Sequence, residues 1–475
     1  MKVVRNYLYN AGYQLLTLIV PLITVPYIAR VLGPQGVGIN SYTNSIITYF
    51  LLLGTLGITV YGNREIAYHR DDFEQRTKTF WEIELLQIIT VVVAYALFLI
   101  FILFQTKYKV YFFLQSLWII SGALDISWLF MGMEDFKKTV LRNTLVKIAS
   151  LIAIFVFVKS KSDIGVYIMI LGLAQVLGNL TLWPYLHSVV GKPKIDLSGV
   201  FSHFKPTMML FIPQIATQVY LQLNRTMLGQ LDSVTASGYY DYADKLVKMV
   251  LAVITATGTV MLPHMSHLAA QGSLRRLNRL LYKSFSFSSF LAMPLMFGLA
   301  GIASSLVPLY YGPKFNVVGQ LIIIEAPVAL LIGWSNVIGL QYLMPLSRVK
   351  DYTASVTYGA LANIVINIPL IMTLGVRGAT ISTVISELVV TAYQLFSIRD
   401  MISYRYLFAD MWKFLVASVL MFIPVFWLNL NMSISVFSLA LQVVLGIAIY
   451  FGIIFILKPD ILQDGIYFFK KRKRE

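Results

Sequence analysis

The chain of 475 residues is a succession of apolar stretches of about 20 residues, separated by short charged breaks or breaks rich in Gly and Pro. Such a stretch is long enough to cross a bilayer as a helix, and about twice as long as a membrane strand requires. The windows lie at 8–32, 38–62, 81–105, 110–132, 140–158, 164–188, 206–230, 237–262, 284–310, 317–344, 354–374, 377–398, 414–430 and 436–457. We therefore predict an all-α integral membrane protein with about 14 transmembrane helices.

Composition agrees with this class and excludes several functions. Charged residues make up 13% of the chain, against about 25% in ordinary soluble domains. The chain has no cysteine, which excludes disulfides, thiolate metal sites and a cysteine nucleophile. A membrane-embedded glycan polymerase or ligase is expected to carry a long outer loop, whereas the outer connections here reach only about ten residues. We expect a protein that is not an enzyme.

The distribution of cations predicts the orientation. The formal net charge is +16, and in a multi-span protein such an excess indicates cytoplasmic loops facing anionic lipid rather than a nucleic-acid partner. With the N-terminus inside, 27 of the 38 Lys and Arg fall on inner segments. Seven fall on outer segments, namely Arg30, Lys107, Lys109, Lys159, Lys161, Lys314 and Arg377. Both termini are therefore expected in the cytoplasm.

The four remaining cations fall inside predicted spans, at Lys147, Arg225, Lys245 and Lys248. Near the bilayer centre each costs about 2.5–3.5 kcal/mol unless it faces a cavity or a partner. These positions are where we expect function.

An internal repeat recurs at an offset of about 195 to 200 residues, where segment 30–33 corresponds to 225–229 and Gly38 to Gly238. It predicts two halves with the same orientation, related by an axis along the membrane normal, and halves of this kind usually enclose a central cavity. We expect an N-terminal bundle at 1–190, a cytoplasmic linker at 191–205, a C-terminal bundle at 206–398, and two further helices with a basic tail at 399–475.

One face of the eighth predicted span is charged. Asp241, Asp244, Lys245 and Lys248 lie at i, i+3, i+4 and i+7, so they share one side of a helix, with each acid four residues before a lysine. Two interpretations remain open. The residues form two internal ion pairs that only line the helix, or they form a cavity wall that attracts an anionic headgroup.

Two arginines occupy repeat-related positions toward the outer ends of spans. Arg225 follows Asn224 in the seventh span, and Arg30 ends the first. Arginine keeps its charge and binds phosphate oxygens through a planar fork, so both are candidates for holding a pyrophosphate. The alternative is that their side chains reach outward to lipid headgroups.

Intramembrane carboxylates provide the third set of candidates. Asp125 in the fourth span and Lys147 in the fifth carry opposite charges, so a cross-helix ion pair is one interpretation and a site that responds to protons or cations is the other. Glu325 and Glu387, in the tenth and twelfth spans, are interpreted in the same way.

With these features in place, the sequence resembles the Wzx-type oligosaccharide flippases of the polysaccharide transporter family, within the larger MOP group that includes multidrug exporters and lipid II flippases. The resemblance covers nearly the whole chain and depends on the order and spacing of several stretches. They are 26–33, 36–43, 56–57, 61–67, 125–128, 134–137, 142–143, 228–229, 238–240 and 260–263, with Gly132, Lys147, Ala243 and Lys245. Two departures matter. Many relatives have Leu-Asp-Lys where this chain has Leu223-Asn224-Arg225, which puts ion coupling at this position in doubt. His264 stands where an arginine is common, so an always-charged group is replaced by one that titrates near neutral pH.

The resemblance implies a MATE-like fold of two bundles around a cationic cavity, and a bacterial plasma membrane protein. It implies a substrate, an undecaprenyl-pyrophosphate-linked oligosaccharide moved by alternating access for capsule or exopolysaccharide, with glycosyltransferases and a polymerase of the same pathway as partners. The implied alternatives are lipid II, a teichoic acid precursor or a cation-coupled drug exporter.

Twelve residues are accordingly the candidates. The expected substrate residues are Arg225, Lys245, Lys248, Lys147, Arg30, Arg64, Asn224, Asp241 and Asp244. Those for ion coupling are Asp125, Glu325 and Glu387. We expect no metal site and no cofactor beyond coupling to an H⁺ or Na⁺ gradient.

Overall fold

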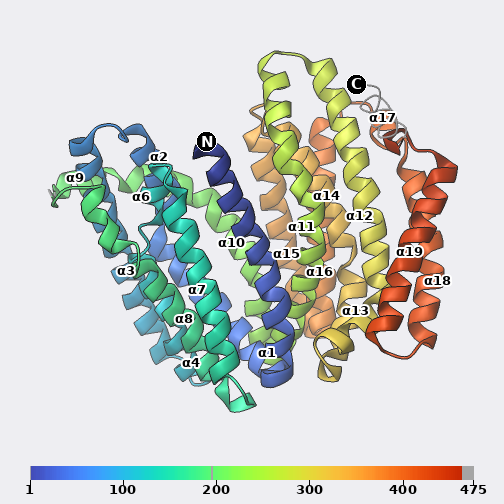
Figure 1. Cartoon of the computed structure of the whole chain (residues 1–475), viewed down its shortest axis with the longest axis horizontal. Helices are drawn as coiled ribbons and strands as arrows, with labels where there is room; N and C mark the ends of the chain where they lie inside the picture. Colours follow the sequence, from blue (N-terminus) through green and yellow to red (C-terminus); the bar gives the residue numbers. More distant parts are fainter. Residues whose placement is uncertain (1, 194–195, 463–475) are drawn as a thin grey trace. The chain divides into compact units, whose positions relative to one another are not determined.

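The computed structural model describes residues 2–193 and 196–462, with the side chains of 2–18, 136, 212–214, 216, 217, 256, 257, 259 and 260 left aside. In these ranges the regular secondary structure is helical and contains no strand, as predicted. The chain divides into two compact units, Met1–Gly238 and Tyr239–Glu475 (Figure 1). The bundle and linker boundaries expected from the repeat remain a prediction.

The first unit holds ten α-helices, two short 3₁₀ segments and the start of an eleventh helix among its described residues. They are α1 (Lys2–Thr55), α2 (Ile58–Tyr68), α3 (Phe73–Leu103), α4 (Lys109–Gln115), α5 (Leu117–Ala123), α6 (Ser127–Gly132), α7 (Phe136–Phe157), η1 (Lys161–Asp163), α8 (Ile164–Leu180), η2 (Trp183–Ser188), α9 (Leu197–Ser202) and α10 (Phe204–Leu231), followed by α11 (Val234–Ala270).

The second unit contains most of α11 and the helices that follow it. These are α12 (Leu274–Tyr310), η3 (Pro313–Phe315), α13 (Asn316–Glu325), α14 (Pro327–Ser335), the π-helical η4 (Asn336–Leu343), α15 (Val349–Leu374), α16 (Val376–Ile398), α17 (Tyr404–Leu407), α18 (Met411–Asn431) and α19 (Val436–Leu457).

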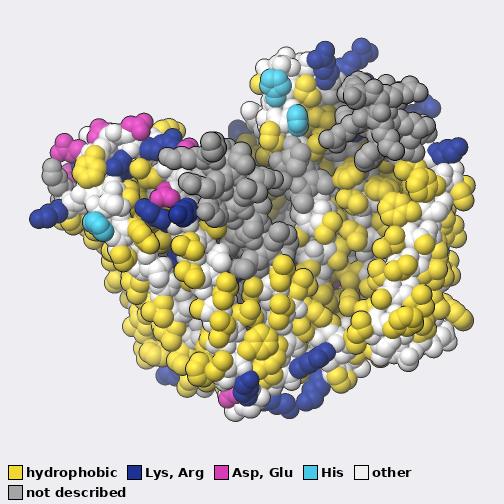
Figure 2. Space-filling model, viewed as in Figure 1, with side chains coloured by type: hydrophobic (Ala, Val, Ile, Leu, Met, Phe, Trp, Pro, Cys, Tyr) yellow, Lys and Arg dark blue, Asp and Glu magenta, His cyan; other side chains and the backbone are white. Residues whose placement is uncertain are grey.

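Every predicted span falls on helix, although the helices are divided differently from the windows. Among the described residues, ten helical segments are long and apolar enough to cross a membrane, or eleven when the bent pair Pro313–Glu325 and Pro327–Leu343 counts as one span. Ile19–Tyr68 includes the first two windows in one segment, and α10 and α11 occupy the seventh and eighth windows. Figure 2 shows hydrophobic side chains on the flanks of each unit and charged ones at its ends. The protein is therefore a multi-pass membrane protein.

Local sequence explains where these helices break. α1 bends at Gly33, whose φ of 71° is a left-handed conformation that favours glycine, and Pro34 follows directly. α3 begins at a capped end, because the Asp72 side chain accepts hydrogen bonds from the backbone of Glu74 and Gln75. The 45° bend between α13 and α14 lies at Ala326, before Pro327.

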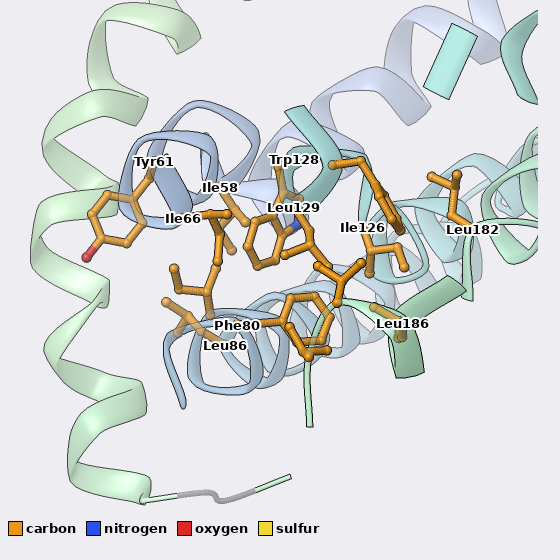
Figure 3. Close-up of a cluster of buried hydrophobic side chains, with 14 of the residues drawn as sticks. Ile58, Tyr61, Ile66, Phe80, Leu86, Ile126, Trp128, Leu129, Leu182 and Leu186 are labelled. Carbon is orange, nitrogen blue, oxygen red and sulfur yellow. The ribbon is translucent and has the colours of Figure 1, made fainter. Parts of the chain in front are cut away.

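The interior of the first unit is organised around an apolar cluster that joins α2, α3, α6 and η2 (Figure 3). Trp128 lies fully buried against Phe80, with ring centroids 5.3 Å apart. Ile58, Ile66 and Leu129 complete the contact. This cluster includes Phe80, Ile83 and Leu86, so it packs against the stretch of α3 that carries the acids Glu82 and Glu84.

Two repeat-related glycines meet inside the first unit. A β-carbon on Gly38 would lie 1.9 Å from the carbonyl oxygen of Val234, and one on Gly238 would lie 2.7 Å from the backbone nitrogen of Gly38. Next to this contact, the Ser41 hydroxyl donates to the carbonyl oxygen of Ser237 at 3.4 Å. The backbones of α1 and α11 therefore cross without side chains between them.

We predict that Gly38→Ala destabilises the protein by about 1–3 kcal/mol, because the added methyl overlaps a carbonyl oxygen that belongs to a helix backbone. Gly452→Ala in α19 is the matched control, since a β-carbon there meets nothing within 4 Å. Thermal unfolding of the purified protein in detergent measures both. Equal unfolding temperatures for the two variants would contradict the backbone crossing.

Candidate functional site

The charged face of α11 forms two ion pairs. Lys245 Nζ lies 2.6 Å from Asp241 Oδ2, and Lys248 Nζ lies 2.7 Å from Asp244 Oδ2. The two carboxylate side chains are 6% exposed, whereas those of Lys245 and Lys248 are 37% and 41% exposed. Lys245 Nζ also lies 4.9 Å from the ring centroid of Tyr242. Both pairs expected from the spacing are confirmed.

The two ion pairs of α11 are oriented alike, with the carboxylate buried and the ammonium partly exposed. Each pair places its negative end in the interior and its positive end toward the surface of the second unit. The potential at that surface is therefore positive, although each pair is neutral. Such a face can attract an anionic group without leaving a buried charge uncompensated, and whether it does so in this protein stays a prediction.

The residues around Arg225 lie in the first unit, on α10. Asn224 is buried and Arg225 is half-buried, with its Nη1 donating to Gln222 Oε1 at 3.1 Å. The next residue, Thr226, exchanges hydrogen bonds with α1, at 2.9 Å to the Ser45 hydroxyl and 3.2 Å to the Tyr49 hydroxyl. These bonds fix the register of α10 on α1.

The other predicted cations of the first unit lie on separate helices. Arg30 is exposed on α1, three residues before the break at Gly33. Arg64 on α2 is exposed and contacts Glu65 at 3.0 Å, and Lys147 is half-buried on α7. The candidate substrate residues are thus divided between the units: Lys245, Lys248 and their aspartates belong to the second, and the rest belong to the first.

Asp125 has a different partner from the one expected. Its Oδ1 accepts the backbone N–H of Ser127 at 3.0 Å, at the start of α6, and lies 3.5 Å from Arg142 Nη1. Arg142 in turn donates to Asn179 Oδ1 at 2.8 Å. The ion pair of Asp125 is therefore formed with Arg142 and not with Lys147, as one of the two interpretations had it, and the alternative of an ion-responsive site stays a prediction. Arg142 precedes Lys147 on the same helix by five residues, which changes the face by more than a third of a turn.

Glu325 and Glu387 are both buried in the second unit. Glu325 ends α13, directly before the bend at Pro327, and Glu387 lies on α16, which packs against α13. Their assignment to ion coupling is untested.

The sequence-based predictions missed two buried acids, Glu82 and Glu84, in the third span. Glu82 Oε2 lies 3.2 Å from His203 Nε2, and Tyr61 shares a hydrogen bond of 2.6 Å with His203 Nδ1. Glu84 is fully buried, with no exposed surface. Their signal in the sequence is two carboxylates at i and i+2 inside the apolar window 81–105.

Charged residues inside membrane-spanning helices are costly, and they mark candidate functional sites. Residues 3–269 match the family model described as "Polysaccharide biosynthesis protein". The chain belongs to this family.

The sequence is also similar to those of known proteins. A protein of Escherichia coli K12 named "Putative O-antigen transporter" is 25% identical over 403 residues, which cover 83% of this chain and 96% of that protein. The "Probable low-salt glycan biosynthesis flippase Agl15" of Haloferax volcanii is 20% identical over 277 residues, 57% of this chain and 58% of that one.

The fold has solved counterparts. "Lipid II flippase MurJ, inward closed conformation" superposes with a TM-score of 0.76 at 16% identity, covering 96% of this chain and 100% of that chain. An inward-facing multidrug MATE transporter of the MOP superfamily gives 0.61 at 11% identity, covering 80% and 95%. The MOP fold expected from the sequence is confirmed.

We predict that the two halves of an α11 ion pair respond differently to removal. Lys248→Met leaves the buried Asp244 carboxylate without its ammonium and destabilises the protein by about 1–3 kcal/mol. Asp244→Asn costs less, because the half-exposed lysine can turn to water. Thermal unfolding in detergent measures the stability of both variants. A larger loss of stability in Asp244→Asn than in Lys248→Met would contradict an orientation with Asp244 buried and Lys248 exposed.

Proposed function

We propose that the protein is a flippase that moves undecaprenyl-pyrophosphate-linked oligosaccharide units from the inner to the outer leaflet of the bacterial plasma membrane, with both termini in the cytoplasm. The polymer it serves is capsule or another exopolysaccharide. The observation that carries the proposal is the match to the O-antigen transporter over 96% of that protein's length. The family description and the MurJ-like fold support it.

In this proposal the cargo has three chemically different parts, and each requires a different surface. The pyrophosphate requires fixed cations, for which Arg225, Lys147 and the lysines of α11 are the candidates. The glycan requires hydrogen-bonding walls, and the polyprenyl tail can stay in lipid. Alternating access of the two halves then reopens the site on the other side.

The geometry of α11 favours an anionic cargo over a cationic drug. A cavity for cationic drugs is expected to present carboxylates, whereas Asp241 and Asp244 are buried and the Lys245 and Lys248 side chains are the exposed ends of both pairs. Lipid II is the second candidate cargo, because a lipid II flippase of Bacillus subtilis is 25% identical over 168 residues, 35% of this chain. A teichoic acid precursor shares the same anionic linkage chemistry.

Proteoliposomes test the proposal directly. We expect the reconstituted protein to bring a labelled polyprenyl-pyrophosphate oligosaccharide to the opposite leaflet, where an enzyme or quencher that cannot cross the membrane detects it. Movement of lipid II in the same assay would show that it is the cargo instead. Transport of a soluble cationic drug without movement of either lipid would overturn the proposal.

Arg225 provides a residue-level prediction for this assay. Arg225→Ala is expected to slow translocation by roughly tenfold or more, since a hydrogen bond to a charged group contributes about 1.5–3 kcal/mol. Arg225→Lys keeps the charge but loses the fork, so its rate should lie between the two. Arg399→Ala is the control, because Arg399 is half-exposed and pairs with the neighbouring Asp400. Unchanged rates in both Arg225 variants would remove this residue from the site.

A further inference from the structure

Glu84 on α3 is a buried acid whose charge nothing in its surroundings compensates. It has no exposed surface, and neither carboxylate oxygen has a hydrogen-bond partner among the described residues. It lies on the stretch of α3 that belongs to the apolar cluster of Figure 3, between Ile83 and Leu86. An ionised carboxylate is strongly disfavoured in such a place, whereas a protonated one is a small neutral group.

The donors nearest along the helix are already engaged. Gln87, one turn after Glu84, donates through Nε2 to the carbonyl oxygens of Gly122 and Asp125. Its Oε1 accepts the Trp128 indole N–H at 3.2 Å. Gln87 therefore uses both ends of its amide to join α3 to α5 and α6, and has no N–H aimed at the acid.

Glu82, two residues earlier on α3, is a buried acid that has basic side chains beside it. Its Oε2 lies 3.2 Å from His203 Nε2, and its Oε1 lies 3.8 Å from Lys78 Nζ. Tyr61 of α2 holds the other ring nitrogen of His203. His203, which follows α9, therefore contacts Glu82, and Tyr61 of α2 contacts His203. They bring no cation to Glu84.

The remaining elements packed against α3 bring one further charge, and it has the wrong sign. It is Asp125, which follows α5 and whose carbonyl oxygen accepts a hydrogen bond from Gln87, one turn after Glu84. The cation of this region, Arg142, lies 3.5 Å from Asp125 and is thus engaged with that residue. α5 itself carries no titratable residue.

Helices α1 and α4 make their aromatic contacts with α3 far from Glu84. Phe50 and Phe112 both contact Phe101, with ring centroids 5.4 and 5.5 Å apart. Phe101 lies almost five helical turns beyond Glu84. Nearer to Glu84, the Thr90 hydroxyl of α3 donates to the carbonyl oxygen of Gly54 in α1, so this contact brings no charge to the acid.

We propose that Glu84 is a proton-binding site inside the first unit, neutral in this conformation, and that it releases its proton to water when a change of conformation hydrates α3. One proton leaves and the carboxylate remains, and reburial requires that a proton returns. Asp125 is partly exposed and lies 3.5 Å from Arg142, so its charge is already compensated, whereas Glu84 carries the exchangeable proton. A role for this proton in driving transport rests on the proposed function, but the site itself does not.

Infrared spectroscopy of the reconstituted protein tests the site without any substrate. In the difference between the wild-type and Glu84→Gln spectra near neutral pH, a C=O stretching band of a buried protonated carboxylic acid should belong to the wild type alone, separate from any band of the buried Glu325 and Glu387. Glu82→Gln is the matched control and should keep the band. Asp125→Asn is a second control, because Asp125 is an acid that already has a cation, and it should also keep the band. A wild-type spectrum without the band, or a band that Glu84→Gln retains, would overturn the proposal.

Sodium distinguishes the proton from a metal cation at the same carboxylate. The band should be unchanged when Na⁺ replaces K⁺ at constant pH, because the Gln87 amide oxygen already accepts the Trp128 N–H and is not available as a second ligand. Loss of the band on addition of Na⁺ would overturn the proposal in favour of a sodium site.

The translocation assay then tests the coupling. Wild-type translocation should accelerate severalfold under an imposed pH gradient, while Glu84→Gln should show the gradient-free rate under both conditions. A gradient response retained by Glu84→Gln would overturn the coupling while leaving the infrared result intact. If wild type moves no lipid-linked oligosaccharide, the proposed function fails, and the infrared assignment stands or falls separately.

Discussion

The cost of a charge in apolar surroundings is the constraint on which the interior of this protein depends. Along the first unit it is met by side chains from different helices, as in the Asp125–Arg142 contact and the Glu82–His203 contact. On α11 it is met within a single helix by Asp241–Lys245 and Asp244–Lys248. Glu84 has neither kind of partner among the described residues. Protonation, which removes the charge, is the remaining way to avoid its cost.

Close backbone packing is the second element of the design. Without a hydrophobic force between helices in lipid, small residues permit the contacts that hold a bundle together. The crossing of Gly38 and Gly238 is an example, and the hydroxyls of Ser41, Ser45 and Thr226 continue it with hydrogen bonds between helices. The apolar cluster around Trp128 adds side-chain packing between α2, α3, α6 and η2.

The sequence predicted what depends on one segment at a time. Hydropathy placed every span on helix, and an i, i+4 spacing was enough for the pairs on α11, because a helix alone decides those neighbours. The partner of Asp125 was not predictable in this way, since it depends on how α7 turns against α6. The isolation of Glu84 was not predictable either, because it depends on which side chains the other helices of the first unit place against α3.

The ion pairs of α11 have a further consequence for how this protein is made. A span with four charged residues enters the bilayer at a cost set by its net uncompensated charge and by how its side chains reach water. Because each aspartate is one turn before its lysine, the helix neutralises itself as soon as it forms, before any other helix is present to help. The segment can thus be inserted as an almost neutral helix, and its positive surface is available only after the carboxylates have been packed inward.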